Sequence, residues 1–97
     1  MKSATLKALK GSIAKWEGIL AEEIYDDGSD NCPLCNLFLD SNCAGCPVRN
    51  KTGDYGCEGS PYVEWRKSDG NGDTASTPKL KKIALAEINF LNSLLPK

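Results

Sequence analysis

Hydrophobic positions in the first quarter of the chain recur at the spacing of an α-helix. Large apolar residues follow one another every three or four positions, at Leu6, Leu9, Ile13, Trp16, Leu20 and Ile24. This period places them on one face of a helix, which we expect to span residues 4–25. Gly11 and Gly18 interrupt it at a cost of about 1 kcal/mol each, so the helix needs tertiary packing to be stable. The turn-forming segment that begins at Asp26 is expected to end it.

A second apolar stripe lies near the C-terminus. Thr77-Pro78 combines a hydroxyl N-cap with proline at the first helical position, and Pro96 marks the end of the stripe. We therefore expect a helix over residues 78–95. Because each of the two helices has one apolar face, they are expected to pack against each other as an antiparallel pair. The positions that form the second stripe are Leu80, Ala84, Ile88, Leu91 and Leu95.

The segment between these helices shows weaker helical signals. We expect a short helix over residues 36–41 and another over residues 60–67. The second segment opens with Ser60-Pro61, which suits the start of a helix. Residues 68–77 are mostly Gly, Ser, Asp, Asn and Thr, which is the composition of a flexible linker. The pattern predicts no strand. The predicted fold is one mainly α domain over residues 1–97, with a terminal helix pair, one or two short helices and a loop-rich central region.

All five cysteines lie in a central region that is poor in large aliphatic residues. Residues 26–77 are rich in Gly, Asp, Asn, Ser and Pro. Ordering the chain costs about 1–2 kcal/mol per residue, and the hydrophobic burial available in this region is too small to offset that cost. We therefore expect the region to be clamped by sulfur ligation of a metal ion.

The spacing of the cysteines indicates a metal site over residues 32–57. Cys32 and Cys35 form one C-x-x-C pair, Cys43 and Cys46 form a second, and Cys57 follows after ten further residues. Two such pairs supply the four thiolates that bind a structural zinc ion in a tetrahedral shell. Five cysteines compete for four positions, so the shell consists of the two pairs, or Cys57 replaces one member, with Cys43 the first candidate. Glycines close to Cys57 favour the second choice, because they let the backbone approach a ligand.

Two other uses of the cysteines stay open. An all-thiolate site also suits an iron–sulfur cluster, although the spacing matches neither the bacterial nor the plant-type ferredoxin motif. Cys43-Ala-Gly-Cys46-Pro47 is a C-x-x-C pair followed by proline, as in some redox proteins. A thioredoxin-like motif would adjoin a strand and a helix, however, and no strand is predicted.

A second candidate cation site lies in the predicted linker. Asp69, Asn71 and Asp73 repeat the first half of a calcium-binding EF-hand loop. The glycine and the bidentate glutamate of such a loop are replaced by Thr74 and Leu80, so the strongest ligand is missing. We favour a flexible acidic linker.

The aromatic residues are expected to have packing roles. Trp16 lies on the apolar stripe of the first helix and is expected in the core. Tyr62 and Trp65 are expected to cover the gap between the metal-binding region and the helix pair. An aromatic surface for stacking on nucleic acid is the alternative.

Charge and composition narrow the classes of function. The net charge is -1, which gives no overall attraction to nucleic acid or to an anionic membrane. The chain contains no histidine, and an all-cysteine shell leaves no open position for a catalytic water, so we expect no enzymatic activity. The chain has no apolar stretch typical of a signal peptide or membrane span, and an odd number of cysteines disfavours disulfides. A cytoplasmic location is expected.

The cysteine motifs resemble those of small uncharacterised proteins of tailed bacteriophages and prophages. This resemblance implies a phage- or prophage-encoded protein that acts in the cytoplasm of a bacterial host, and it implies no particular activity. The closing helix, which ends at Pro96, is similar as well, and the recurrence of the Cys57 segment in the pattern favours Cys57 as a ligand. The residues that carry the resemblance are Cys32-Pro-Leu-Cys35, Cys43-Ala-Gly-Cys46-Pro47-Val48, Thr52-Gly53, Gly56-Cys57 and Ser60-Pro61-Tyr62.

The function that these observations favour is a zinc-stabilised protein-interaction module acting on a host or phage protein. Zinc would hold residues 32–57 as a rigid unit that presents side chains to the partner, with an exposed apolar or acidic patch nearby. The alternative is a nucleic-acid-binding zinc module, which requires the lysines of residues 2–15 and 79–82 to form one basic face. In an antiparallel helix pair these two groups lie at opposite ends.

Overall fold

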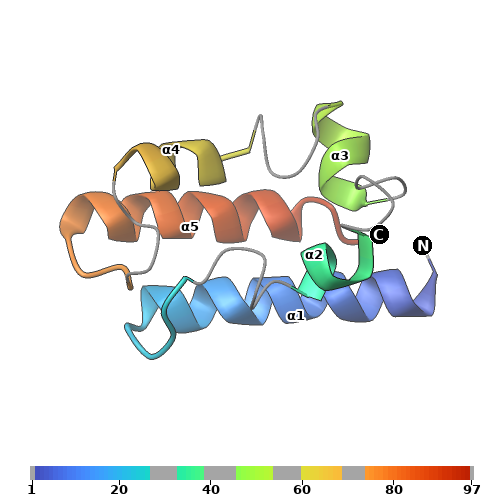
Figure 1. Cartoon of the computed structure of the whole chain (residues 1–97), viewed down its shortest axis with the longest axis horizontal. Coiled ribbons are helices and arrows are strands. Elements are labelled where there is room, and N and C mark those ends of the chain that lie inside the picture. The colour runs from blue at the N-terminus through green and yellow to red at the C-terminus, as the bar shows by residue number, and fades with distance from the viewer. Residues whose placement is uncertain (1, 27–32, 39–45, 54–59, 69–73, 97) are drawn as a thin grey trace.

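The computed structural model describes residues 2–26, 33–38, 46–53, 60–68 and 74–96. These residues contain no strand. The two longest helices, α1 and α5, pack along each other and run in opposite directions (Figure 1). This arrangement confirms the mainly helical fold and the pairing of the terminal helices. The described helices are α1 (Ser3–Leu20), α2 (Pro33–Phe38), α3 (Pro47–Thr52), α4 (Tyr62–Lys67) and α5 (Pro78–Asn92).

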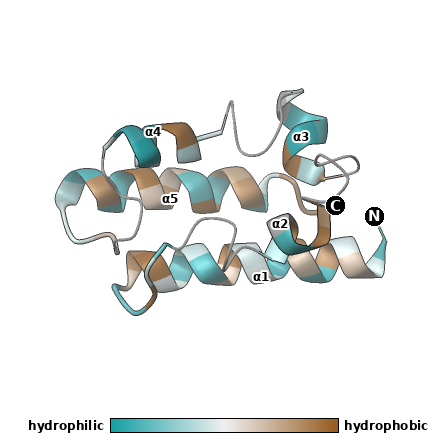
Figure 2. Ribbon diagram, viewed as in Figure 1, coloured by the Kyte–Doolittle hydropathy of each residue, from teal (hydrophilic) through white to brown (hydrophobic). Residues whose placement is uncertain are grey.

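One hydrophobic core joins the long helices to the short ones. Hydrophobic and hydrophilic residues alternate along α1 and α5 in Figure 2, as expected for helices with one buried face. α2 packs against α1, and α4 packs against α5. The protein measures 35 × 22 × 22 Å, with the long axis along the helix pair. The buried apolar residues include Leu9, Ile13, Trp16, Ile19, Leu34, Val48, Trp65, Ala75, Leu80, Ala84, Ile88 and Leu91.

Helix α1 ends at Leu20 rather than at residue 25. The N–H of Glu23 donates to the carbonyl of Gly18 at 2.9 Å, and the N–H of Glu22 donates to the carbonyl of Ile19 at 3.1 Å. With Glu22 in the left-handed region at φ 61°, these bonds form a Schellman motif, which satisfies carbonyls at the end of a helix. Ile24 folds back onto Gly18, where a Cβ would lie 2.8 Å from Ile24 Cγ1. Ile24 continues the helical spacing of apolar residues in the sequence, but in the structure it lies beyond the end of the helix and its side chain packs over Gly18.

Helix α5 begins as predicted and ends earlier than predicted. The hydroxyl oxygen of Thr77 accepts a hydrogen bond from the N–H of Leu80 at 3.1 Å, which confirms the N-cap. The helix ends at Asn92 rather than at residue 95. The Ser93 hydroxyl donates to the carbonyl of Phe90 at 2.5 Å and so satisfies one of the last carbonyls of the helix.

The short helices differ from the prediction in number and position. The N–H of Tyr62 donates to the hydroxyl oxygen of Ser60 at 3.3 Å, but α4 begins at Tyr62 rather than at residue 60, and its N-cap residue is Pro61 rather than Ser60. Helix α2 begins at Pro33 rather than at residue 36. Helix α3 was not predicted, so the described residues contain three short helices rather than one or two. Its signals are Pro47 at the first position and Gly53 after the last, at φ 79°.

The predicted linker over residues 68–77 falls partly outside the described residues. The calcium-loop-like segment at residues 69–73 lies there as a whole. Thr74 and Ala75 are buried, and the N–H of Ala75 donates to the carbonyl of Ile19 at 3.0 Å. This last part of the segment is therefore fixed against the end of α1.

Candidate functional site

Two of the five predicted metal ligands belong to short helices at the same end of the molecule. Cys35 lies within α2, and Cys46 is the N-cap residue of α3. Figure 1 shows both helices near the N-terminal half of α1 and the C-terminal end of α5. Cys46 is 5% exposed and belongs to the hydrophobic core. We call this region, defined by α2 and α3, the cysteine end.

The remaining ligands of the predicted zinc shell are not placed. Cys32, Cys43 and Cys57 lie outside the described residues, as does the side chain of Cys35. Among the side chains that the structure describes, no group of three or more cysteine, histidine or acidic residues is arranged to hold a metal ion. Zinc binding, and the choice between Cys43 and Cys57, therefore stay predictions.

The two short helices of the cysteine end begin with the same local pattern. Each starts with a proline that directly follows a cysteine in the sequence, and each has a buried aliphatic residue at its second position, Leu34 in α2 and Val48 in α3. The N–H of Leu34 donates to Ser12 Oγ of α1 at 3.4 Å. At Gly11, a Cβ would lie 3.0 Å from Pro33 Cγ. The absence of a side chain at Gly11 therefore allows α2 to approach α1 closely.

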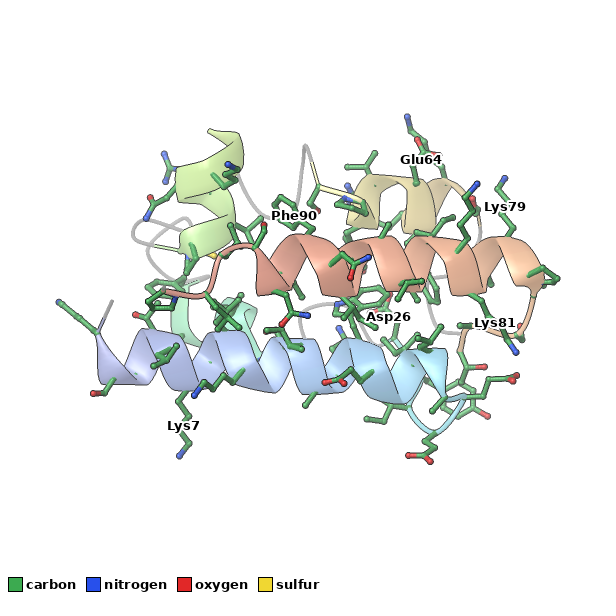
Figure 3. The ribbon with its side chains drawn as sticks, turned by 180° about the vertical axis from the view of Figure 1, so that it is seen from behind. Lys7, Asp26, Glu64, Lys79, Lys81 and Phe90 are labelled. Atoms are coloured by element: carbon green, nitrogen blue, oxygen red, sulfur yellow. The ribbon has the colours of Figure 1, made fainter. Side chains whose placement is uncertain are left out.

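A buried polar cluster lies beside the C-terminal half of α1. Asp26 is 0% exposed, and Figure 3 shows it between α1 and α5. Its Oδ1 atom accepts a hydrogen bond from Lys15 Nζ at 3.0 Å. Its Oδ2 atom accepts hydrogen bonds from the Tyr62 hydroxyl at 3.1 Å and from Trp65 Nε1 at 2.9 Å. Both carboxylate oxygens are therefore hydrogen-bonded, and the negative charge is paired with the buried ammonium group of Lys15.

Three aromatic rings surround this polar cluster. Trp16 makes edge-to-face contacts with Tyr62, at a centroid separation of 5.7 Å, and with Trp65, at 5.0 Å. The ammonium nitrogen of Lys15 lies 5.5 Å from the centroid of the Trp16 ring. Trp16 is in the core, as expected. Tyr62 and Trp65 pack against Trp16 in the C-terminal half of α1, and most of the metal-binding region that they were expected to adjoin lies outside the described residues.

The geometry of the polar cluster indicates a structural role. Asp26 has no contact with solvent, and its hydrogen bonds join the segment after α1 to α4. No buried side-chain nitrogen or oxygen in the described part of the chain lacks a hydrogen-bond partner. The sequence pattern did not indicate this cluster. A buried tryptophan usually requires an acceptor for its N–H group, but that signal does not say which acidic residue supplies it.

The exposed lysines form two separate groups. Lys2, Lys7 and Lys10 lie in the N-terminal half of α1 or directly before it, whereas residues 79–82 begin α5. Figure 3 shows Lys7 at one end of the molecule and Lys79 and Lys81 at the other. Lys81 Nζ lies 3.5 Å from a carboxylate oxygen of Glu22. Lys15, which was counted with the first group, is buried against Asp26 and does not contribute to a surface.

Large apolar side chains are exposed in several places. Leu37, on α2, is 44% exposed and lies at the cysteine end. Ile24 and Tyr25 are exposed in the turn after α1 and directly follow Glu22 and Glu23 in the sequence. Leu85 is 49% exposed on the outer surface of α5. No described helix is sufficiently long and apolar to cross a lipid bilayer.

Comparisons with known proteins give no relative. No protein-family model matches this chain, and no match was found among curated proteins or among solved structures. The function must therefore be argued from the residues of the chain.

Proposed function

We propose that this chain is a zinc-stabilised protein-interaction module, encoded by a phage or prophage, that acts on a partner protein in the bacterial cytoplasm. The observation that carries the proposal is the placement of Cys35 and Cys46, one from each C-x-x-C pair, on short helices at the same end of the helix pair. Two C-x-x-C pairs brought to one end of a domain supply the donors of a closed, four-thiolate zinc site. Such a site supports structure and not catalysis.

The size of the short helices supports the need for a metal. Each of α2 and α3 has six residues, and ordering twelve residues costs about 12–24 kcal/mol. Burying Leu34 and Val48 offsets only part of that cost, and ligation of a structural zinc ion would offset more of it.

The proposed shell contains Cys32, Cys35 and Cys46, with either Cys43 or Cys57 as the fourth ligand. The shell would join the beginning of α2 to the beginning of α3, because both helices directly follow a cysteine in the sequence. An iron–sulfur cluster uses the same donor type and is the alternative that the experiment below must separate from zinc.

The exposed surface supports a protein partner. Leu37 on α2 is an exposed apolar side chain at the cysteine end, where the metal would hold the backbone rigid. A rigid apolar side chain loses little conformational entropy when a partner covers it. The two exposed lysine groups lie at opposite ends of the molecule, which favours a protein partner over a nucleic acid.

Elemental analysis of purified protein tests the metal. We expect one zinc ion per chain and no iron. The variants Cys35→Ser and Cys46→Ser should lose the zinc. Of the variants Cys43→Ser and Cys57→Ser, one should lose it and the other should keep it. Absence of bound metal in the unmodified protein, or full zinc content in both Cys35→Ser and Cys46→Ser, would contradict the proposal.

A matched pair of surface variants tests the interaction. Leu37→Glu should abolish capture of a specific bacterial protein from lysate by the zinc-loaded chain. Leu85→Glu changes a similarly exposed leucine on α5 and should leave capture unchanged. Both variants should keep one zinc ion per chain. Equal capture by the two variants would exclude the cysteine end as the binding surface.

A further inference from the structure

One face of α1 carries exposed side chains along its whole length. The buried residues of α1 lie on the opposite side of the helix, and Figure 3 shows Lys7 projecting from α1 away from α5. The exposed positions recur at alternating steps of four and three residues, which is the spacing of a seam along which two helices pack. We call these residues the outer face of α1: Ser3, Lys7, Lys10, Ala14, Glu17 and Ala21.

The charges of the outer face are ordered along the helix. Its lysines lie in the N-terminal half of α1 and its glutamate lies in the C-terminal half. The first turn of α1 contains no acidic residue, and the last turn contains no basic one. The helix dipole favours the reverse order, with acidic side chains near the N-terminus and basic side chains near the C-terminus. The observed order therefore does not stabilise α1.

Neighbouring charges within α1 do not explain this order either. Lys7 and Lys10 are like charges three positions apart, which is an unfavourable spacing on a helix. Glu17 has no basic residue three or four positions away. The charges of the outer face thus have no favourable partner on their own helix.

Two copies of the outer face match each other when they run in opposite directions. With the ends of the two faces aligned, Lys7 lies opposite Glu17 of the second copy. In the same register, Lys10 lies opposite Ala14 of the second copy, so its alkyl stem covers a short side chain while its ammonium group stays in water. A two-fold axis repeats every contact, so the Lys7–Glu17 ion pair forms twice. A parallel pair would instead bring lysine against lysine and glutamate against glutamate.

We infer that the outer face of α1 is a self-association surface, on which a second copy of this chain packs antiparallel with two Lys7–Glu17 ion pairs. Exposed ion pairs contribute little each, so the association is weak and depends on concentration, and the monomer prevails in dilute solution. Because the two copies run in opposite directions, the dimer holds its two cysteine ends apart. The inference goes beyond the proposed function and does not depend on the zinc site.

Sedimentation equilibrium of the full-length protein, at low salt and with a reducing agent, tests the inference. We expect a monomer–dimer equilibrium that shifts toward the monomer when salt is added. The variants Lys7→Glu and Glu17→Lys should each weaken association by about tenfold or more, because two ion pairs become two contacts between like charges. Each variant adds a charge that the dipole of α1 favours, so circular dichroism should show no loss of helix.

Matched charge changes on other helices are the controls. Lys82→Glu on α5 and Glu64→Lys on α4 alter exposed residues by the same charge and should leave association unchanged. An equimolar mixture of Lys7→Glu and Glu17→Lys should associate more tightly than either variant alone, because opposite charges face each other again. The double variant that carries both changes should recover association by itself, which a parallel pair would not allow.

Three outcomes would overturn the inference. The first is a monomer at every concentration. The second is association that Lys7→Glu weakens no more than Lys82→Glu does, because the interface then lies elsewhere. The third is a double variant that does not recover association, because the copies then do not pair antiparallel through these residues. Zinc content does not enter any of these measurements, so the inference and the proposed function stand or fall separately.

Discussion

Asp26 illustrates what a single buried charge requires of its surroundings. A carboxylate that is removed from water is costly unless it is paired and hydrogen-bonded. Asp26 meets this condition with donors from two helices, Lys15 of α1 and both Tyr62 and Trp65 of α4. Lys15 and Asp26 are each more than nine-tenths buried. Loss of one partner therefore leaves the other as an uncompensated charge inside the protein.

The variant Asp26→Asn should strongly destabilise the protein. The amide keeps the shape of the side chain but leaves the ammonium group of Lys15 without a counter-charge, which costs about 3–5 kcal/mol at a buried ion pair. Urea denaturation followed by tryptophan fluorescence measures the change. Glu17→Gln, which removes an exposed carboxylate of α1, is the control and should change stability by less than about 0.5 kcal/mol. A loss of less than about 1 kcal/mol for Asp26→Asn would show that the pair contributes little.

The backbone conformation of Glu22 carries a measurable cost in folding free energy. It occupies the left-handed region at φ 61°, which disfavours residues that carry a Cβ by about 1–2 kcal/mol. Glu22→Gly should therefore raise the free energy of unfolding by about 1 kcal/mol, even though it removes the exposed ion pair with Lys81, because such pairs contribute little. Thermal denaturation measures the gain. Glu23→Gly, at a position without a positive φ, should give no gain, and equal effects of the two changes would contradict this account.

At the scale of elements, glycine positions decide how the helices meet. Gly11 and Gly18 both lower the helical propensity of α1, yet each lies where another segment approaches closely. Pro33 of α2 lies over Gly11, and Ile24 lies over Gly18. The helix therefore loses intrinsic stability at the two places where it gains a close contact.

A double-mutant cycle at Gly18 and Ile24 tests this account. Gly18→Ala in the unmodified protein should fail to stabilise α1, because the new Cβ requires Ile24 to move. In the Ile24→Ala background, where the two nearest atoms (Cδ1 and Cγ1) are absent, the same change should stabilise the protein by up to about 1 kcal/mol. Chemical denaturation of the four proteins gives the coupling. An identical effect of Gly18→Ala in both backgrounds would show that the contact does not limit the helix.

At the scale of the whole molecule, the antiparallel arrangement determines how charge is distributed. The lysines that begin α5 lie beside the C-terminal end of α1, and those of the N-terminal half of α1 lie at the cysteine end (Figure 3). The long axis measures 35 Å, so the two groups do not act on one short stretch of a ligand.

This arrangement predicts weak binding to nucleic acid. We expect a fluorescently labelled oligonucleotide to show no specific, salt-dependent binding to the purified protein when the salt concentration is varied between about 50 and 200 mM. Fluorescence anisotropy measures it. A steep loss of affinity over this range would instead support a nucleic-acid-binding module and would count against a protein partner.

The parts of the fold that could be predicted depend on local chemistry. The apolar stripes of the two long helices and the hydroxyl cap at Thr77 involve residues a few positions apart. Helix α3 had recognisable signals at both ends, Pro47 and Gly53, but it contains few apolar residues, so its periodicity was weak. The predicted end of α1 was too late in the chain. Ile24 continues the helical spacing of apolar residues, although its side chain packs over Gly18 after the helix has ended.

For the candidate site, cysteine spacing predicted the ligands, and the structure adds that Cys35 and Cys46 lie at one end. The sequence by itself determined the two long helices and the five cysteines as candidate ligands, because helical period and ligand spacing are properties of neighbouring residues. Only the tertiary structure decided which charges are buried and which helices share an end. The contacts that decide this join distant positions, such as Asp26 with Lys15 eleven residues away and with Trp65 thirty-nine residues away. A hydrogen bond between distant residues depends on how whole helices pack, and no local pattern contains that information.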